Sequence, residues 1–386
     1  MAEQHGKALV PQIRFAGFTD PWEQRKLGEL YKEVSEKNDL TYGRDRIISV
    51  AHMYFNPVVY VTEDDYLKTY NVMRLGDIAF EGNRSKNFAH GRLVENTIGD
   101  GIVSHVFKVF RPIRPFDLMY WKYSINNEKA MKDVLTRSTK ASTMMHELVA
   151  KDFLNEEIAV PSLEEQRQIG AFFDRLDSLI TLHQRKYDKL CVLKKSMLDK
   201  MFPKGGSLYP EIRFAGFTDP WEQRKLGELY KEVSEKNDLT YGRDRIISVA
   251  HMYFNPVVYV TEDDYLKTYN VMRLGDIAFE GNRSKNFAHG RLVENTIGDG
   301  IVSHVFKVFR PIRPFDLMYW KYSINNEKAM KDVLTRSTKA STMMHELVAK
   351  DFLNEEIAVP SLEEQRQIGA FFDRLDSLIT LHQRKY

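Results

Sequence analysis

An internal repeat constrains this 386-residue chain more than any other feature of its sequence. Residues 13–187 recur without a change as residues 212–386, so each of them has a twin 199 positions later. Solenoid repeats have periods of roughly 20 to 50 residues, so a repeat of this length predicts a whole domain with a connector. We therefore expect two identical bodies related by an approximate two-fold axis. Residues 188–205, which include the single cysteine Cys191, occur only once.

Composition predicts an ordinary globular protein, with 43% hydrophobic and 28% charged residues. The sequence has no run of about 18 apolar residues, and its first residues lack the apolar core of a secretory signal. A single cysteine cannot form a disulfide within the chain. We therefore expect a cytoplasmic protein. The formal net charge is only +2, so any basic surface must be local.

Two kinds of sequence alternate within each copy. Residues 22–38 and 115–137 have a helical character. Strand-like segments lie between them, separated by Gly, Asn, Asp and Pro, at residues 46–55, 58–63, 76–82 and 101–112. We predict an α+β domain with a mostly antiparallel sheet.

A long helix with a sharp start is predicted to follow each domain. Ser162 and Glu165 have the spacing of a capping box, in which the carboxylate reaches back to the cap amide. Apolar residues then recur at coiled-coil spacing until Pro203, which predicts a helix of about 60 Å. A second helix with the same stripe begins after Ser361. The stripe residues that we expect to form the contact are Ile169, Phe172, Leu176, Leu179, Leu190 and Leu193, with Ile368, Phe371, Leu375 and Leu378.

The two helices are predicted to pair as an antiparallel coiled coil, because an amphipathic helix cannot bury its stripe alone. The alternative is that each helix packs only on its own domain. The second helix lacks counterparts of residues 188–203, which would leave part of the first helix without an equivalent partner. The predicted boundaries are 1–155 and 206–354 for the α+β domains, 156–205 for the central helical region, and 355–386 for a truncated distal helical region.

Nothing in the sequence has the pattern of an active site. The histidines do not have zinc spacing, and the turn at Gly99 fails both the dinucleotide and the phosphate-loop spacing. Asn56-Pro57 lacks the second proline of the loop with which adenine methyltransferases hold a flipped base. We therefore predict no catalytic residue, no bound metal and no cofactor on this chain.

A basic, turn-rich stretch is the best candidate for binding. Residues 81–140 contain eleven Lys or Arg residues and only six Asp or Glu residues. Within this stretch and just after it, the predicted loops 82–92 and 136–143 are rich in basic and polar side chains. Arg and Asn can read guanine and adenine, whereas Lys, Ser and Thr suit phosphates. The alternative is a solvated charged surface. The predicted DNA-binding residues are Arg84, Lys86, Asn87, His90, Arg92, Arg137, Thr139 and Lys140, with the twins Arg283, Lys285, Asn286, His289, Arg291, Arg336, Thr338 and Lys339.

Several motifs resemble the DNA specificity subunit of type I restriction-modification systems. They are WEQRKLGEL, GIVSHVFKVFRP, KDFLNEEIAVPSLEEQRQIGAFFDRLDSLI and LKKSMLDKMFP, and the resemblance covers nearly the whole chain. It implies two target-recognition domains that each read half of a split DNA sequence. It also implies two helical regions that pair as an antiparallel coiled coil and measure the unread spacer.

The resemblance further implies a subunit without catalytic activity that works with two kinds of partner. These are modification (methyltransferase) subunits, which carry S-adenosylmethionine, and restriction motor-nuclease subunits. The family usually has two different recognition domains, whereas identical domains predict an interrupted palindrome as the double-stranded DNA target. Two other interpretations stay open: an orphan adenine methyltransferase or nuclease, and a coiled-coil adaptor that does not bind DNA.

Overall fold

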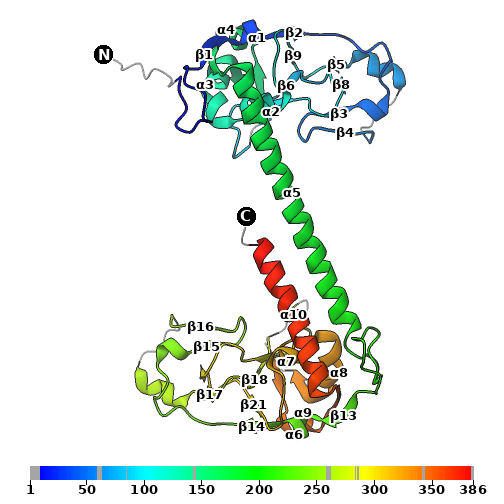
Figure 1. Ribbon diagram of the computed structural model, residues 1–386, viewed down its shortest axis with the longest axis vertical. Helices are drawn as coiled ribbons and strands as arrows, with labels where there is room; N and C mark the ends of the chain where they lie inside the picture. The colour runs from blue at the N-terminus through cyan, green and yellow to red at the C-terminus, as the bar shows by residue number, and fades with distance from the viewer. Residues whose placement is uncertain are drawn as a thin grey trace. The chain divides into compact units, whose positions relative to one another are not determined.

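The computed structural model describes residues 9–58, 63–83, 85–141, 145–257, 262–282, 284, 287–340 and 344–383. The chain divides into two compact units, Met1–Thr181 and Leu182–Tyr386. Figure 1 shows their elements, and helix α5 (Leu163–Lys200) runs from the first unit into the second.

The first unit contains short strands and helices in the order expected for an α+β domain. Its strands are β1 (Glu23–Lys26), β2 (Tyr31–Val34), β3 (Ile48–Ser49), β4 (Tyr54–Phe55), β5 (Asn71–Met73), β6 (Ile78–Glu81), β7 (Arg92–Glu95), β8 (Gly101–Val103), β9 (Val109–Pro112), β10 (Thr139–Ala141), β11 (His146–Leu148) and β12 (Glu157–Val160). Its helices before α5 are α1 (Leu27–Leu30), α2 (Leu118–Ile125), α3 (Glu128–Ser138) and α4 (Ala150–Asn155), with 3-10 turns η1 (Arg44–Arg46) and η2 (Asp64–Thr69).

The second unit repeats this order. Its strands are β13 (Glu222–Lys225), β14 (Tyr230–Val233), β15 (Ile247–Ser248), β16 (Tyr253–Phe254), β17 (Asn270–Met272), β18 (Ile277–Glu280), β19 (Arg291–Glu294), β20 (Gly300–Val302), β21 (Val308–Pro311), β22 (Thr338–Ala340), β23 (His345–Leu347) and β24 (Glu356–Val359). Its helices are α6 (Leu226–Leu229), α7 (Leu317–Ile324), α8 (Glu327–Ser337), α9 (Ala349–Asn354) and α10 (Leu362–Gln383), with 3-10 turns η3 (Arg243–Arg245) and η4 (Asp263–Thr268).

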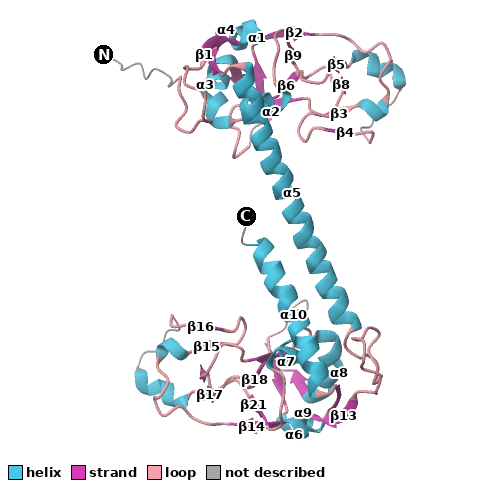
Figure 2. Ribbon diagram, in the orientation of Figure 1, coloured by secondary structure: helices cyan, strands magenta, loops and turns pink. Residues whose placement is uncertain are grey.

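A four-stranded antiparallel sheet, in the order β2-β9-β6-β7, separates two cores in the first unit. Alternate residues of a strand point to opposite faces. Accordingly, Ile78 and Phe80 of β6 lie in one core, which includes side chains of α2, α3 and α4, and Ala79 lies in the other. The sheet β14-β21-β18-β19 does the same in the second unit. Figure 2 shows how short these strands are beside the loops that join them.

The helix predicted for residues 22–38 is wrong. Strand β1 pairs antiparallel with β12, with Glu23 opposite Val160, and only the single turn α1 is helical before β2 begins at Tyr31. Leu27 and Leu30 are buried in the domain core. Pairing with a strand more than a hundred residues away therefore overrides local helix propensity.

The strand predictions agree better with the structure. Residues 76–82 contain β6, and residues 101–112 form β8 and β9, separated by a turn in which the Phe107 amide donates to the Ser104 carbonyl at 3.0 Å. Residues 46–55 contain the hairpin β3-β4. Residues 59–62 of the remaining predicted strand lie outside the described residues.

The helical prediction for residues 115–137 is confirmed, but as two helices. Helix α2 ends at Ile125, and Asn127 caps α3 by accepting a hydrogen bond from the Ala130 amide at 3.2 Å. Asp117 caps α2 in the same way through the Tyr120 amide, at 2.8 Å. Two capping side chains therefore position two separate helices on the sheet.

The predicted start of the long helix is confirmed in one of its two contacts. The Glu165 amide donates to the Ser162 hydroxyl at 3.3 Å, and α5 continues for 38 residues. The Glu165 carboxylate instead accepts two hydrogen bonds from the Arg14 guanidinium, each of 2.7 Å. Arg14 also lowers the pKa of Glu165 and ties the segment before β1 to the helix.

Candidate nucleic-acid interface

The loop between β6 and β7 lies within the predicted binding stretch 82–92 and depends on its two glycines. A Cβ atom at Gly82 would lie 2.0 Å from the His146 carbonyl oxygen, so no larger residue fits there. Gly91 has a φ of 77°, in the left-handed region that favours glycine. Gly82 therefore allows a close approach of two backbone segments, and Gly91 allows a left-handed turn.

The tip of this loop presents Lys86 and Asn87. The Ser85 amide donates to the Phe88 carbonyl at 3.0 Å, and the Phe88 amide donates to the Ser85 hydroxyl at 3.1 Å. These bonds close a tight turn with Lys86 and Asn87 between its ends, and both residues are exposed. A lysine beside an amide side chain on a closed turn suits a phosphate and a base edge. Arg84 lies outside the described residues.

Arg92 anchors the base of the loop. Its Nε donates to the Glu81 carboxylate at 2.7 Å, and a terminal nitrogen donates to the Ala51 carbonyl. The guanidinium lies over the Phe88 ring at 5.2 Å. With these partners, Arg92 is better suited to holding the loop in place than to contacting a base.

The structure brings the two predicted loops together through His146, which is not among the predicted binding residues. The His146 amide donates to the Gly82 carbonyl at 2.8 Å, and the His146 ring lies 5.1 Å from the ring of His90. The Thr139 hydroxyl lies 3.3 Å from Nδ1 of His146. No local motif marks His146, because its role follows from a contact between segments more than fifty residues apart.

The second predicted loop is the hairpin β10-β11 with the last turn of α3. Lys140 is exposed on β10, opposite Glu147 of β11. Arg137 is also exposed, but its guanidinium donates at 2.9 and 3.0 Å to Glu156, whose hydrogen bond raises the pKa of Arg137. Thr139 donates to the Leu135 carbonyl at 2.6 Å. Lys140 is thus the member of this group most available to DNA, and residues 142–144 lie outside the described residues.

The second unit repeats these contacts where it is described. Arg291 binds Glu280 at 2.7 Å, and the rings of His289 and His345 are 5.1 Å apart. Thr338 donates to the Leu334 carbonyl at 2.6 Å, while Arg336 pairs with Glu355 and Lys339 is exposed. Arg283, Lys285 and Asn286 lie outside the described residues.

A buried carboxyl group lies on β7, the strand that follows the loop. Neither oxygen of Glu95 has a hydrogen-bond partner, and the same is true of its twin Glu294 on β19. Burial raises the pKa of Glu95 to about 9 and that of Glu294 to about 10, and the nearby charge of Asp117 or Asp316 raises each further. Both side chains are therefore neutral at pH 7, which avoids the large cost of burying an isolated charge.

Within the described residues, no group of three or more His, Cys, Asp or Glu side chains could hold a metal ion. The same part of the chain contains no helix with the length and apolarity needed to cross a membrane.

Both copies match a known protein family. Residues 19–191 and 218–386 each match the family described as "Type I restriction modification DNA specificity domain". The chain belongs to this family.

Two relatives agree with this assignment, and one solved structure shares the fold. The chain is 23% identical to the type I restriction enzyme MjaVIII specificity subunit of Methanocaldococcus jannaschii, covering 95% of this chain and 88% of that protein. It is 22% identical to the putative MjaX specificity subunit of the same organism, covering 71% and 64%. The crystal structure of the HsdS subunit from Thermoanaerobacter tengcongensis shares the fold, with a TM-score of 0.51, 20% identity and coverage of 96% and 93%.

As a type I DNA specificity subunit, the chain confers sequence specificity and is not itself an enzyme. The interpretation as an orphan methyltransferase or nuclease is not favoured.

Helices α5 and α10 of this specificity subunit pair antiparallel within the second unit. His183 meets its twin His382 with Nδ1 atoms 3.0 Å apart, Lys194 bonds Asp376 at 2.5 Å, and the rings of Phe202 and Phe372 are 6.1 Å apart. From His183 through Lys194 to Phe202, residue numbers rise along α5 and just beyond it. Their partners on α10 fall from His382 to Asp376 and Phe372, so the two helices are antiparallel. Helix α10 also packs on its own domain, because Phe372 contacts Tyr322 of α7. The two-fold relation predicted between the copies stays a prediction.

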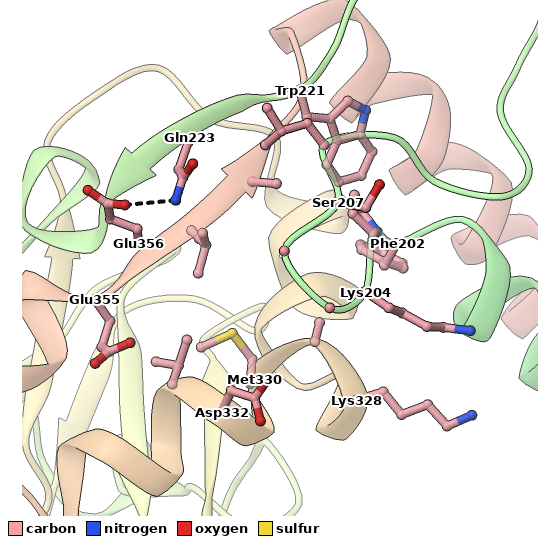
Figure 3. A pocket seen from close by; sticks show the side chains of 18 of the residues that line it. Phe202, Lys204, Ser207, Trp221, Gln223, Lys328, Met330, Asp332, Glu355 and Glu356 are labelled. Carbon is pink, nitrogen blue, oxygen red and sulfur yellow. Dashed lines mark hydrogen bonds between the residues drawn. The ribbon is translucent and has the colours of Figure 1, made fainter.

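The predicted stripe residues are buried unevenly. In the second unit Ile368 and Leu375 are buried, Phe371 and Leu190 are half-buried, and Leu378 and Leu193 are exposed. In the first unit only Ile169 is half-buried, and the burial predicted for Phe172, Leu176 and Leu179 is wrong, since all three are exposed. In the second unit, the corresponding face packs against Leu190, Met197 and Phe202, which come from α5 and the residues just after it. Figure 3 shows Phe202 and Trp221 among the residues that line a pocket just after α5.

Proposed function

We propose that this chain binds double-stranded DNA through its two identical units and reads the same half-site twice, as an interrupted palindrome. The observation that carries the proposal is the separate match of each copy to the DNA specificity family. Identical readers have identical base preferences, so the two halves of the target must be the same sequence. The predicted antiparallel pairing of the spacer helices would place these halves on opposite strands.

The proposed contact surface in each unit is the turn at residues 85–88 together with the hairpin β10-β11. Lys86 and Lys140 would contact phosphates, and Asn87 would read a base edge. Arg92, Arg137 and Thr139 would position these segments, because their side chains are bonded within the protein. His90 would support the turn through its ring contact with His146. Arg84 would also belong to this surface, and each second-copy residue would have the role of its first-copy twin.

The proposed partners are the modification and restriction subunits of a type I system. The support is the name of the relative from Methanocaldococcus jannaschii, which is a specificity subunit of a type I restriction enzyme. S-adenosylmethionine would bind to the modification subunits and not to this chain.

The test is selection of bound duplexes from a random DNA library, with the purified chain alone and with its modification subunits. We expect enrichment of one half-site in inverted orientation, separated by an unread spacer of fixed length. Two different half-sites, or a direct repeat, would contradict the palindrome. The absence of any enrichment at low salt would instead favour the adaptor that does not bind DNA.

A further inference from the structure

The hairpin β3-β4 lies against the base of the candidate DNA loop and is not among the predicted binding segments. A terminal nitrogen of Arg92 donates to the carbonyl of Ala51, which lies in the turn that joins the two strands. The same guanidinium bonds Glu81 at 2.7 Å and lies 5.2 Å from the centre of the Phe88 ring. One side chain therefore holds the loop and the hairpin turn beside each other.

The turn of this hairpin has a strained backbone. Ser49 pairs with Tyr54 across the two strands, and the Met53 amide donates to the Ser49 carbonyl at 2.8 Å. Met53 has a φ of 48°, in the left-handed region that residues with a Cβ atom rarely adopt. Surrounding contacts must hold such a residue in place, and strained residues of this kind cluster at functional sites. The turn is therefore a candidate for binding.

Met53 divides the turn between the protein interior and solvent. Its side chain packs against an apolar core of the first unit, whereas its neighbours His52 and Tyr54 are exposed. The rings of His52 and Tyr54 lie 6.3 Å apart. The turn thus presents an imidazole and a phenol together on a backbone that is anchored from below.

A cation lies on the same hairpin. The guanidinium of Arg46 is 4.9 Å from the centre of the Phe55 ring, and Arg46 is exposed. Its Nε lies 3.9 Å from the Asp45 carboxylate, which is too far for a hydrogen bond. A basic side chain beside exposed rings with polar atoms suits the phosphates and base edges of a nucleic acid.

The second unit has the same arrangement. Met252 has a φ of 47°, and the exposed rings of His251 and Tyr253 lie 6.3 Å apart. Arg291 donates to the Ala250 carbonyl at 2.5 Å. Both units therefore carry the hairpin in the same place beside the strand that follows the basic loop.

We propose that the turn of β3-β4 is a third DNA-contacting segment of each unit, in which His52 reads a base edge and Tyr54 binds a phosphate. An imidazole can donate and accept hydrogen bonds, as base edges in the major groove do. A phenolic hydroxyl can donate to a phosphate oxygen, a contact that carries no sequence information. The inference rests on the proposed function, because it places this turn on the duplex that Lys86 and Asn87 contact.

The experiment compares the duplexes that the full chain and its variants select from a random DNA library. His52→Ala with His251→Ala should reduce the preference for the best base at least about fivefold at one position in each half-site. The slope of log affinity against log salt should stay the same, because a base contact releases no phosphate counterion.

Tyr54→Phe with Tyr253→Phe keeps both rings and removes only the hydroxyls. This variant should bind all sequences at least about threefold more weakly and keep the same base preference. The matched control is Tyr66→Phe with Tyr265→Phe, because Tyr66 of η2 is 47% exposed and Tyr54 is 48% exposed. The control should change neither affinity nor preference, and thermal unfolding of all three variants should match that of the unchanged chain.

Selection by the unchanged chain separates two kinds of failure. If the unchanged chain enriches no half-site, the proposed DNA-binding function and the hairpin contact are both overturned. If it enriches a half-site and the histidine variant keeps the same preference at every position, the base contact is overturned while the proposed function stands. A tyrosine variant with unchanged affinity would overturn the phosphate contact.

Discussion

Single residues decide how the candidate DNA surface is built. Lys86 and Asn87 reach solvent because two hydrogen bonds between Ser85 and Phe88 close the turn around them. Arg92 is turned inward by Glu81 and by the Ala51 carbonyl. Basic residues that look equivalent in the sequence therefore divide into those that contact solvent and those that hold the loop.

Lys86→Ala together with Lys285→Ala should weaken DNA binding for all sequences alike. Each phosphate contact releases about one counterion, so the slope of log affinity against log salt should fall by about 2 for two lost contacts. Titrations of duplex binding at several salt concentrations would measure this slope. The matched control is Lys151→Ala with Lys350→Ala, on the exposed sides of α4 and α9, which should leave the slope unchanged.

Glu95 and Glu294 make the stability of the domains depend on pH. The folded-state pKa of each is raised above that of the unfolded chain, so the folded state holds its proton more tightly. Their stabilising effect is fully present below about pH 4.5 and is lost as pH rises through about 9 to 10. Each residue contributes at most about 1.4 kcal/mol per pH unit across this window.

Glu95→Gln with Glu294→Gln should therefore flatten the decline of the unfolding free energy between pH 5.5 and pH 8.5, two conditions inside the window of about 4.5 to 9. The amide has nearly the shape of the neutral acid but cannot lose a proton. Urea unfolding at the two pH values would measure the change. Glu33→Gln with Glu232→Gln, at exposed positions of β2 and β14, serves as the control. An equal decline in both double variants would contradict this assignment.

At the scale of elements, the segment that packs or pairs with each element decided its secondary structure or burial where the local sequence did not. Residues 23–26 became a strand because β12 pairs with them, although their surroundings favour a helix. The long helices were predictable because their caps and apolar repeats lie within the helices themselves. Their burial was not predictable, since it depends on which segment packs against each face.

Leu375→Ala should lower the unfolding free energy of the second unit by about 2 to 5 kcal/mol, the usual cost of truncating a buried leucine. The matched change Leu176→Ala in the first unit should cost less than about 1 kcal/mol, because its side chain is exposed. Denaturant titrations of both variants would give the comparison. Equal costs at the two positions would show that both faces are covered in solution.

For the whole molecule, the repeat links the two half-sites of the proposed target. Each substitution can be made in one copy or in both, and the two units should respond independently because they are separate compact bodies. A family member with two different recognition domains does not offer this internal control.

Asn87→Ala alone should relax base preference in one half-site, and Asn87→Ala with Asn286→Ala should relax both halves at the same position. Loss of one base contact costs about 1 to 3 kcal/mol and affects one position. Sequencing of duplexes selected by each variant would measure the preference. Relaxation of both halves by the single change would contradict independent readers.

The sequence by itself determined the duplication, the α+β class, the caps and length of the central helix, and the motifs of the specificity family. These features depend on residues close together in the chain or on the identity of the copies. Only the tertiary structure decided that residues 23–26 join β12 and that His146 joins the two basic loops. It also decided that one apolar face is covered while its twin is exposed. The burial of a side chain depends on the surface that packs against it. Two identical sequences can therefore differ in burial when different segments pack against them.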